Sequence, residues 1–275
     1  MPKFAANLHY LFAEVPFLDR FEAAANAGFK GVEFQVPYDF PKDELRRRLD
    51  QYGLEMVLFD APMGNWNAGD RGMTCIPGRE AEFRASLERV VEYGKALGCE
   101  TVHVMAGVVG PGMDYETCRR TYIANLRHAA QFLEPHGIHV VIEPINKRLG
   151  IVTNGPSYTT QGMHGYFLNH TADARAAIDA VAHPNLSLHL DCYHMQMLEG
   201  NLADTLRENV GRIRHIQIAG VPGRHEPDVG EINYPFLFDL LDELGYEGWV
   251  GCEYRPKGKT LDGLKWAGRY GIRAA

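Results

Sequence analysis

The sequence predicts an α/β protein that folds as a (β/α)₈ TIM barrel, with residues 1–275 in a single domain. Three observations support this fold. Short apolar runs alternate with longer amphipathic stretches along the chain, which is typical of parallel strands joined by helices. Seven of these runs follow a helix stop, and the N-terminal run "KFAANLH" makes an eighth strand. No G-x-G-x-x-G motif follows the first strand, which disfavours the alternative of a doubly wound open sheet.

The junctions between helices and strands share one feature, a residue that ends the helix shortly before an apolar run. Glycine adopts the left-handed conformation at a helix end at little cost, so it is an effective stop. The junctions are, in chain order, "NAGFKGVEF" with Gly28, "QYGLEMVLF" with Gly53, "ALGCETVHVM" with Gly98, "PHGIHVVIE" with Gly137, "AHPNLSLHLD" with Pro184 and Asn185, "NVGRIRHIQI" with Gly211 and "ELGYEGWVGCE" with Gly245.

The stretches between these runs have the periodicity of helices that pack on a core. In "REAEFRASLERVVEYGKALG" one helical face collects the apolar and small residues Phe83, Leu87, Val90, Val91, Gly94 and Leu97. The stretch "YPFLFDLLDELG" has an apolar stripe and a proline near its first helical position, where proline is favourable. Alternation of such helices with parallel strands implies right-handed crossovers.

Composition and charge exclude several classes of partner. The chain has 275 residues, 45% of them hydrophobic, and a net charge of −7 without a lysine or arginine run, so nucleic acid and anionic membranes are not expected partners. The opening "MPKFAANLHYLF" lacks the apolar region of a signal peptide, and no apolar run reaches membrane-spanning length. The five cysteines are odd in number and form no C-x-x-C, which indicates reduced thiols and a cytoplasmic location.

Oxygen-bearing side chains end four consecutive predicted strands. "IHVVIE" ends at Glu143, "LSLHLD" at Asp191, "RIRHIQ" at Gln217 and "GWVGCE" at Glu253. One such carboxylate is commonly a solvated loop start or a helix cap, but four of them at the catalytic end of a barrel indicate a shared site. A set of oxygen donors suits a hard divalent cation such as Mg²⁺ or Mn²⁺.

Histidines and an arginine extend this predicted site. His194 follows Asp191 in a D-x-x-H pattern, which favours a role in the site over a structural one. His189 lies two residues before Asp191, on the same inward face of the strand, where it either lines the site or packs in a barrel layer; His103 in "TVHVMAG" has the same two alternatives. Arg224, in the loop "AGVPGRHEPDVGEINY", could hold a substrate carboxylate at the rim through its guanidinium or be a solvated loop charge.

Taken together, the chain resembles the hydroxypyruvate isomerase family of the xylose-isomerase-like barrels from Phe4 to Pro256. The closely similar 2-oxo-tetronate isomerases share the same motif set. The matching segments are "FAANLHYLFAEVPFLDRFEAAANAGFKGVEF", "RGMTCIPGREAEFR", "EPIN", "DCYHMQMLEGNL", "HIQIAGVPGRHEPDVGEINY" and "GWVGCEYRP".

The resemblance implies an isomerase of small hydroxy-keto acids that converts hydroxypyruvate to tartronate semialdehyde through an enediolate, without nicotinamide or flavin. It implies proton transfer by Glu143 and Glu253 and substrate contacts from His194 and Arg224. The implied metal ligands are Glu143, Asp191, Gln217 and Glu253. The related ketose 3-epimerases usually have histidine where Gln217 stands, and an amide oxygen is the weaker ligand, so Mg²⁺ or Mn²⁺ is expected to bind weakly.

Other functions remain as alternatives. A 2-oxo-tetronate isomerase is the main one, and a ketose 3-epimerase is less favoured. A metal-dependent hydrolase like endonuclease IV is disfavoured by the negative charge and by the few histidines at strand ends, and a non-catalytic barrel that binds sugar acids would bind without turnover. The sequence leaves open whether the chain forms a homo-oligomer and what the segment 149–165, longer than usual for the family, does.

Overall fold

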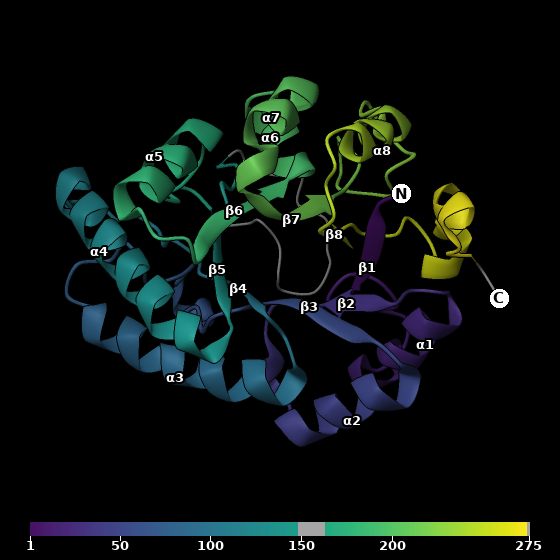
Figure 1. Ribbon diagram of the computed structural model, residues 1–275, viewed down its shortest axis with the longest axis horizontal. Helices are drawn as coiled ribbons and strands as arrows, with labels where there is room; N and C mark the ends of the chain where they lie inside the picture. Colours follow the sequence, from purple (N-terminus) through teal and green to yellow (C-terminus); the bar gives the residue numbers. More distant parts are fainter. Residues whose placement is uncertain (148–162, 274–275) are drawn as a thin grey trace.

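A computed structural model describes residues 1–147 and 163–273 and confirms the predicted TIM barrel (Figure 1). Eight parallel strands pair in chain order, and β1 pairs with β8 to close the sheet into a barrel. The strands are β1 Lys3–Asn7, β2 Gly31–Glu33, β3 Glu55–Asp60, β4 Thr101–His103, β5 His139–Ile142, β6 Leu186–Asp191, β7 Ile213–Ile218 and β8 Trp249–Cys252.

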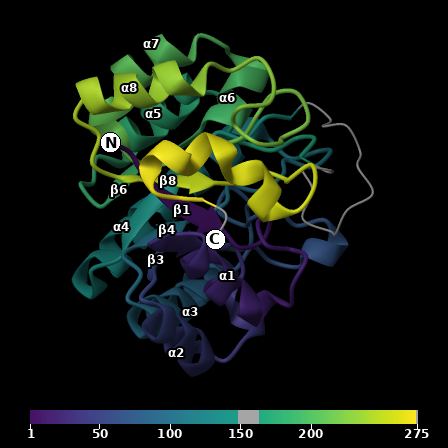
Figure 2. The same cartoon turned by 90° about the vertical axis from the view of Figure 1, so that its right-hand side faces the viewer.

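Helices surround the barrel as an outer layer (Figure 1). The α-helices are α1 Arg20–Asn26, α2 Lys42–Tyr52, α3 Glu80–Leu97, α4 Tyr115–Leu133, α5 Thr171–Val181, α6 Cys192–Leu198, α7 Leu202–Asn209 and α8 Tyr234–Glu243. The 3₁₀ helices are η1 Phe17–Asp19, η2 Pro37–Asp39, η3 Trp66–Ala68, η4 Glu134–His136, η5 Val210–Arg212 and η6 Thr260–Tyr270. η6 lies between α8 and α1 and takes the place of the last helix of the ring (Figures 1 and 2).

Most of the predicted helix stops are confirmed by the backbone. Gly53 and Gly98 end α2 and α3 in the left-handed conformation, with φ of 63° and 66°, and Gly137 ends η4 with φ of 71°. Two expectations were wrong. Ala182, with φ of 51°, ends α5 before the predicted proline and asparagine are reached. Gly211 is not left-handed, because α7 continues directly into the 3₁₀ turn η5.

The predicted apolar face of α3 is buried almost as expected. Phe83, Leu87, Val90, Gly94 and Leu97 are all buried, as the periodicity predicts. The remaining predicted residue, Val91, is only partly buried. Tyr93 is buried instead, and its hydroxyl donates a hydrogen bond to the backbone carbonyl of Phe40 at 2.9 Å. The tyrosine was missed because its hydroxyl makes it polar by residue type, although its ring packs in the core.

Aromatic packing joins the two ends of the chain. The ring of Phe4 on β1 lies 5.1 Å from Phe238 of α8, 5.2 Å from Trp266 and 4.9 Å from Tyr270, the last two in η6. Aromatic pairs at such distances stabilise a core beyond the area that they bury. The seam between β1 and β8 is therefore covered by residues from both termini.

The structure also bears on the predicted thiols. All five cysteines are free and buried, in agreement with the expectation of reduced thiols. None of the helices in the described ranges has the length and apolarity that crossing a membrane would need.

We expect Tyr234→Phe to lower the free energy of unfolding by about 1–3 kcal/mol. The buried hydroxyl of Tyr234 accepts from the amide of Ala219 at 3.1 Å and donates to the carbonyl of Ala219 at 2.8 Å, so its removal leaves a buried amide without an acceptor. Equilibrium urea denaturation measures the change. Tyr115→Phe, at a tyrosine that is 51% exposed, is the matched control. A loss for Tyr234→Phe no larger than for the control would contradict the expectation.

Candidate active site

Polar side chains from all eight strand ends converge at one end of the barrel. The residues within one position of the strand ends are Asn7, Glu33, Asp60, His103, Glu143, Asp191, Gln217 and Glu253. All except Asp191 line a cavity of about 650 Å³, a volume that includes open solvent at its mouth. Apolar side chains, among them Met63, Met105, Ile145 and Met163, complete its wall. The barrel thus presents one shared pocket.

Three of these eight residues were missed by the sequence analysis, although the same signal, a polar residue at the end of a strand, identifies them. This signal was applied to the last four strands only. "KFAAN" ends at Asn7, "GVE" at Glu33 and "VLFD" at Asp60, and these three strands end in polar groups just as the later ones do. A search for polar residues at the ends of all eight predicted strands would have identified these three residues.

Arg224 lies inside the site, not at its rim as predicted. Its side chain is buried, and Nη2 donates to Asp191 Oδ2 at 2.8 Å and to Glu253 Oε2 at 2.6 Å. The guanidinium also lies 5.5 Å from the ring of Tyr10 and 5.0 Å from that of Tyr193. Its Nε has no hydrogen-bond partner among the described residues and remains available to a ligand. Of the described residues that line the cavity, Arg224 alone is a lysine or arginine.

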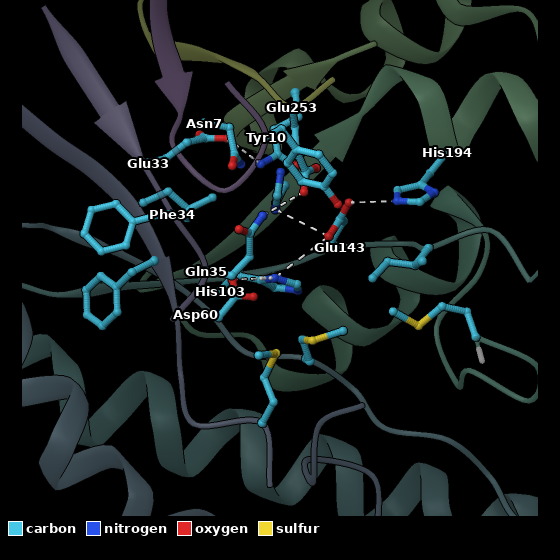
Figure 3. A pocket seen from close by; sticks show the side chains of 18 of the residues that line it. Asn7, Tyr10, Glu33, Phe34, Gln35, Asp60, His103, Glu143, His194 and Glu253 are labelled. Atoms are coloured by element: carbon cyan, nitrogen blue, oxygen red, sulfur yellow. Dashed lines mark hydrogen bonds and ion pairs between the residues drawn. The ribbon is translucent and has the colours of Figure 1, made fainter. Parts of the chain in front are cut away.

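Glu143 lies at the centre of the cavity without a cationic partner of this kind (Figure 3). Its Oε2 is 3.8 Å from Nδ1 of both His103 and His189, and its Oε1 is 3.8 Å from His194 Nε2. Oε1 has no hydrogen-bond partner among the described residues. Burial raises the pKa of Glu143 well above its usual value, and the charge of Asp191 raises it further. Glu143 therefore favours the protonated form.

Glu253 has the opposite environment. Its Oε1 accepts a hydrogen bond from Gln35 Nε2 at 2.7 Å, and its Oε2 accepts from Arg224. Burial raises the pKa of Glu253 to about 8, while the charge of Arg224 lowers it. Hydrogen bonds to the ionised form and a cation both favour the carboxylate. Glu253 is therefore easier to ionise than Glu143.

Asp191 caps a helix and neutralises the arginine. Its Oδ1 accepts from the amide of Tyr193 at the start of α6 at 2.8 Å, and its Oδ2 accepts from Arg224. Burial is the main cause that raises the pKa of Asp191, and Arg224 opposes it. A fully buried carboxylate requires such partners, because leaving it unpaired would cost several kcal/mol.

The three predicted histidines all line the cavity. Asn146 lies close to His194 Nδ1, with the backbone amide at 3.4 Å and the side-chain nitrogen at 2.6 Å, so this ring nitrogen is an acceptor and Nε2 bears the hydrogen. His194 Nε2 is 3.5 Å from Asp191 Oδ2. His103 Nδ1 contacts Asp60 Oδ1 at 3.2 Å. Burial lowers the pKa of His194 and of His189, which keeps both rings neutral.

The residues fit a divalent cation in their donor chemistry. The side chains of Glu143, Asp191 and His194 bring ligand atoms within 4.8 Å of one another, and those of His103, Glu143 and His189 do the same. The three buried carboxyl groups of Glu143, Asp191 and Glu253 share a single arginine, and their raised pKa values show that they lack further cationic partners among the described residues. A bound divalent cation would favour their ionised forms. The full set of predicted metal ligands also includes Gln217 and Glu253, and it stays a prediction. In the structure Glu253 accepts a hydrogen bond from Arg224, and the side-chain NH₂ of Gln217 donates to Glu33.

Comparisons with known proteins agree with this architecture. The family model described as xylose isomerase-like TIM barrel matches residues 21–270. The 2-oxo-tetronate isomerase of Cupriavidus necator is 49% identical over 98% of this chain and 99% of its own length. The 2-oxo-tetronate isomerase of Haemophilus influenzae is 46% identical over 98% of this chain and all of its own. The hydroxypyruvate isomerase of Escherichia coli is 43% identical with the same coverage.

Solved structures give the same fold. A crystal structure titled AP endonuclease, family 2, from Brucella melitensis has a TM-score of 0.92 and 48% identity over 98% of this chain and all of its own. A structure titled L-ribulose 3-epimerase has a TM-score of 0.73 at 20% identity, covering all of this chain and 88% of its own. At that identity the likeness concerns the fold alone.

In metal-free protein, Glu253→Gln should weaken the pH dependence of stability between about pH 4.5 and pH 8. The pKa of Glu253 is raised from 4.5 to about 8 in the folded state, so the folded protein keeps a proton that the unfolded chain releases. This stabilisation is fully present below the unfolded pKa. It is lost as the pH rises through the folded value, by about 1.4 kcal/mol per pH unit.

Urea denaturation with a chelator across this pH range measures the slopes. Glu226→Gln, the same substitution at a buried glutamate outside the cavity lining, is the control. If the free energy of unfolding had the same pH dependence in wild type and in Glu253→Gln, the raised pKa of Glu253 would be contradicted.

Proposed function

Because this chain belongs to the hydroxypyruvate isomerase and 2-oxo-tetronate isomerase family of xylose isomerase-like TIM barrels, we propose that it isomerises 2-oxo-tetronates. It is an isomerase of small hydroxy-keto acids, as predicted. Hydroxypyruvate was the favoured substrate in the sequence analysis, and the four-carbon acid was the alternative. The higher identity to 2-oxo-tetronate isomerases than to the Escherichia coli hydroxypyruvate isomerase supports that alternative.

The observation that carries the mechanism is the contrast between Glu143 and Glu253 across one cavity. Arg224 and Gln35 make Glu253 easier to ionise than Glu143, so Glu253 is the one that becomes a carboxylate as the pH rises toward 8, and a carboxylate can act as a base. Glu143 lacks a cationic partner and favours the acid form. The proposed roles in the direction from the 2-oxo acid are therefore Glu253 as base and Glu143 as acid. Sequence alone left this order open.

The proposed reaction moves one proton between carbons and one between oxygens. Glu253 takes the proton from C3, and the electrons of that bond form an enediolate over C2 and C3 with charge on the C2 oxygen. Glu143 delivers a proton to C2 as the C3 oxygen becomes a carbonyl, and the C3 hydroxyl proton passes to the C2 oxygen. The two carboxyl groups end with their protonation states exchanged and recover them through water.

Stabilisation of the enediolate requires donors aimed at its oxygens. The Nε2 hydrogen of His194 and the unpaired Nε of Arg224 are suitable, and His189 and His103 line the same cavity. The predicted ligands for Mg²⁺ or Mn²⁺ are Glu143, Asp191, Gln217 and Glu253. A cation bound there would supply Lewis-acid stabilisation of the same oxygens.

Glu143→Gln and Glu253→Gln should each lower kcat by about 10²–10⁴-fold, because each removes a positioned proton carrier. The proposed roles make the two variants distinguishable by NMR in deuterated water. Glu143→Gln should still exchange the C3 proton of the 2-oxo acid with solvent, since its base remains. Glu253→Gln should not. If only Glu253→Gln exchanged the C3 proton with solvent, Glu143 would be the base and Glu253 the acid. Near-normal turnover in either variant would show that the substituted glutamate is not a proton carrier.

For the substrate, we expect kcat/KM to favour a 2-oxo-tetronate over hydroxypyruvate by about 10- to 100-fold, the scale at which one additional substrate group is discriminated. Initial rates with both 2-oxo-tetronate enantiomers and with hydroxypyruvate, in the presence of Mg²⁺ or Mn²⁺, measure the ratio. A preference for hydroxypyruvate would restore the first expectation. Turnover of a ketose at C3 with neither acid accepted would point to the epimerase alternative.

A further inference from the structure

Glu33 is a buried glutamate on the wall of the cavity to which no role has yet been given. It is 1% exposed and is the last residue of β2. Its Oε1 accepts from Asn7 Nδ2 at 2.9 Å and from Gln217 Nε2 at 2.6 Å, and its Oε2 lies 2.6 Å from His215 Nε2. Figure 3 shows Asn7 and Glu33 side by side on the wall of the pocket. Three donors from β1 and β7 thus meet on one acidic group.

The contact between Glu33 and Gln217 spans the barrel interior. The two residues belong to β2 and β7, which are separated in the sheet by β1 and β8. On β8, Gly251 is the register partner of Gln217, and a Cβ added there would lie 2.3 Å from Glu33 Oε2. The backbone of Gly251 is not left-handed, so glycine is required there for lack of room for a side chain and not for its backbone conformation. The barrel is therefore built to admit the Glu33 side chain.

The chemistry of this contact determines which way the Gln217 amide points. Glu33 Oε1 already accepts a hydrogen bond from Asn7 Nδ2, so it meets Gln217 as an acceptor, and Gln217 directs its NH₂ group at it. The amide oxygen, on the other branch of the same planar group, is then directed away from Glu33. Asn7 is oriented in the same way, because its Oδ1 accepts from the amide of His9 at 3.1 Å. Without Glu33, half a turn about the last side-chain bond would present the NH₂ of Gln217 to the cavity.

We propose that Glu33 is a positioning residue that acts through Gln217 and keeps the amide oxygen of Gln217 turned toward the reacting centre. The inference rests on the proposed function, in which Gln217 offers an oxygen to a divalent cation or to a substrate hydroxyl. An NH₂ group in that place would repel a cation. In this scheme Glu33 contacts neither the cation nor the substrate, and it acts on the site only through its hydrogen bond with Gln217.

An exchange of the two residues tests the proposal. Gln217→Glu places two carboxylates at a contact that measures 2.6 Å, and kcat should fall by about 10- to 100-fold. Glu33→Gln keeps an acceptor oxygen and should cost only a few-fold. In the double variant Glu33→Gln/Gln217→Glu, the new amide on β2 can donate to the new carboxylate on β7, which again offers an oxygen to the cavity. Asn7 then turns its amide so that Oδ1 faces the new NH₂ group and gives up its hydrogen bond from the amide of His9. The kcat of the double variant should recover by about tenfold or more over Gln217→Glu alone.

The control is the same glutamate-to-glutamine change elsewhere. Glu226→Gln, at a buried glutamate whose Oε1 accepts from the amide of Lys257, should not rescue Gln217→Glu. All rates are measured below the melting temperature of every variant. Additive losses in kcat, or coupling seen in the melting temperatures but not in kcat, would overturn the positioning role.

A second readout separates this inference from the proposed function. In protein labelled with ¹⁵N-glutamine, the Gln217 side-chain NH₂ protons should exchange slowly with solvent, and Glu33→Met should remove that protection. If wild type fails to turn over any 2-keto-3-hydroxy acid, the proposed function is wrong, and the labelled amide still reports on Glu33. If wild type is active but the Gln217 signal is unaffected by Glu33→Met, the positioning role is wrong.

Discussion

The buried ion pair that Arg224 makes with Asp191 and Glu253 is the interaction on which the rest of the site depends. Charges removed from water are tolerated only when they are paired and hydrogen-bonded. One guanidinium nitrogen satisfies an oxygen from each of two strand ends, and the rings of Tyr10 and Tyr193 lie on the arginine. Loops after β1, β6, β7 and β8 are held together by this one cation.

The same pair makes two chemically identical side chains different. Arg224 makes ion pairs with Asp191 and Glu253 but none with Glu143, so burial and like charge outweigh the charge of Arg224 and raise the pKa of Glu143. In the proposed mechanism, the difference between base and acid follows from Arg224, a loop residue that is not itself a proton carrier. In the proposed positioning role, Glu33 on the cavity wall would add a second asymmetry, because it would fix whether the Gln217 amide presents its oxygen or its NH₂ group.

Much of the fold and part of the site could be predicted because they depend on local pattern. Helix stops such as Gly53 and Gly98 and the strand-end residues Glu143 and Glu253 follow from spacing along the chain. The burial of Arg224 could not be predicted, because a loop charge has the same sequence pattern whether it is solvated or paired. Contacts across the barrel depend on closure and register, which no local period reports. The segment 149–165 lies mostly outside the described residues.

The aromatic seam around Phe4 has a consequence for how the chain acquires its structure. One edge of β1 pairs with β8, and Phe4 on β1 packs against α8 and η6. The first strand therefore depends on elements that follow it by more than 200 residues. During synthesis β1 leaves the ribosome with one edge unpaired and keeps it so until β8 has emerged. An open strand edge can pair with other chains. Barrel closure therefore has to wait for β8, and Glu253, which directly follows β8, is the last of the strand-end residues to emerge.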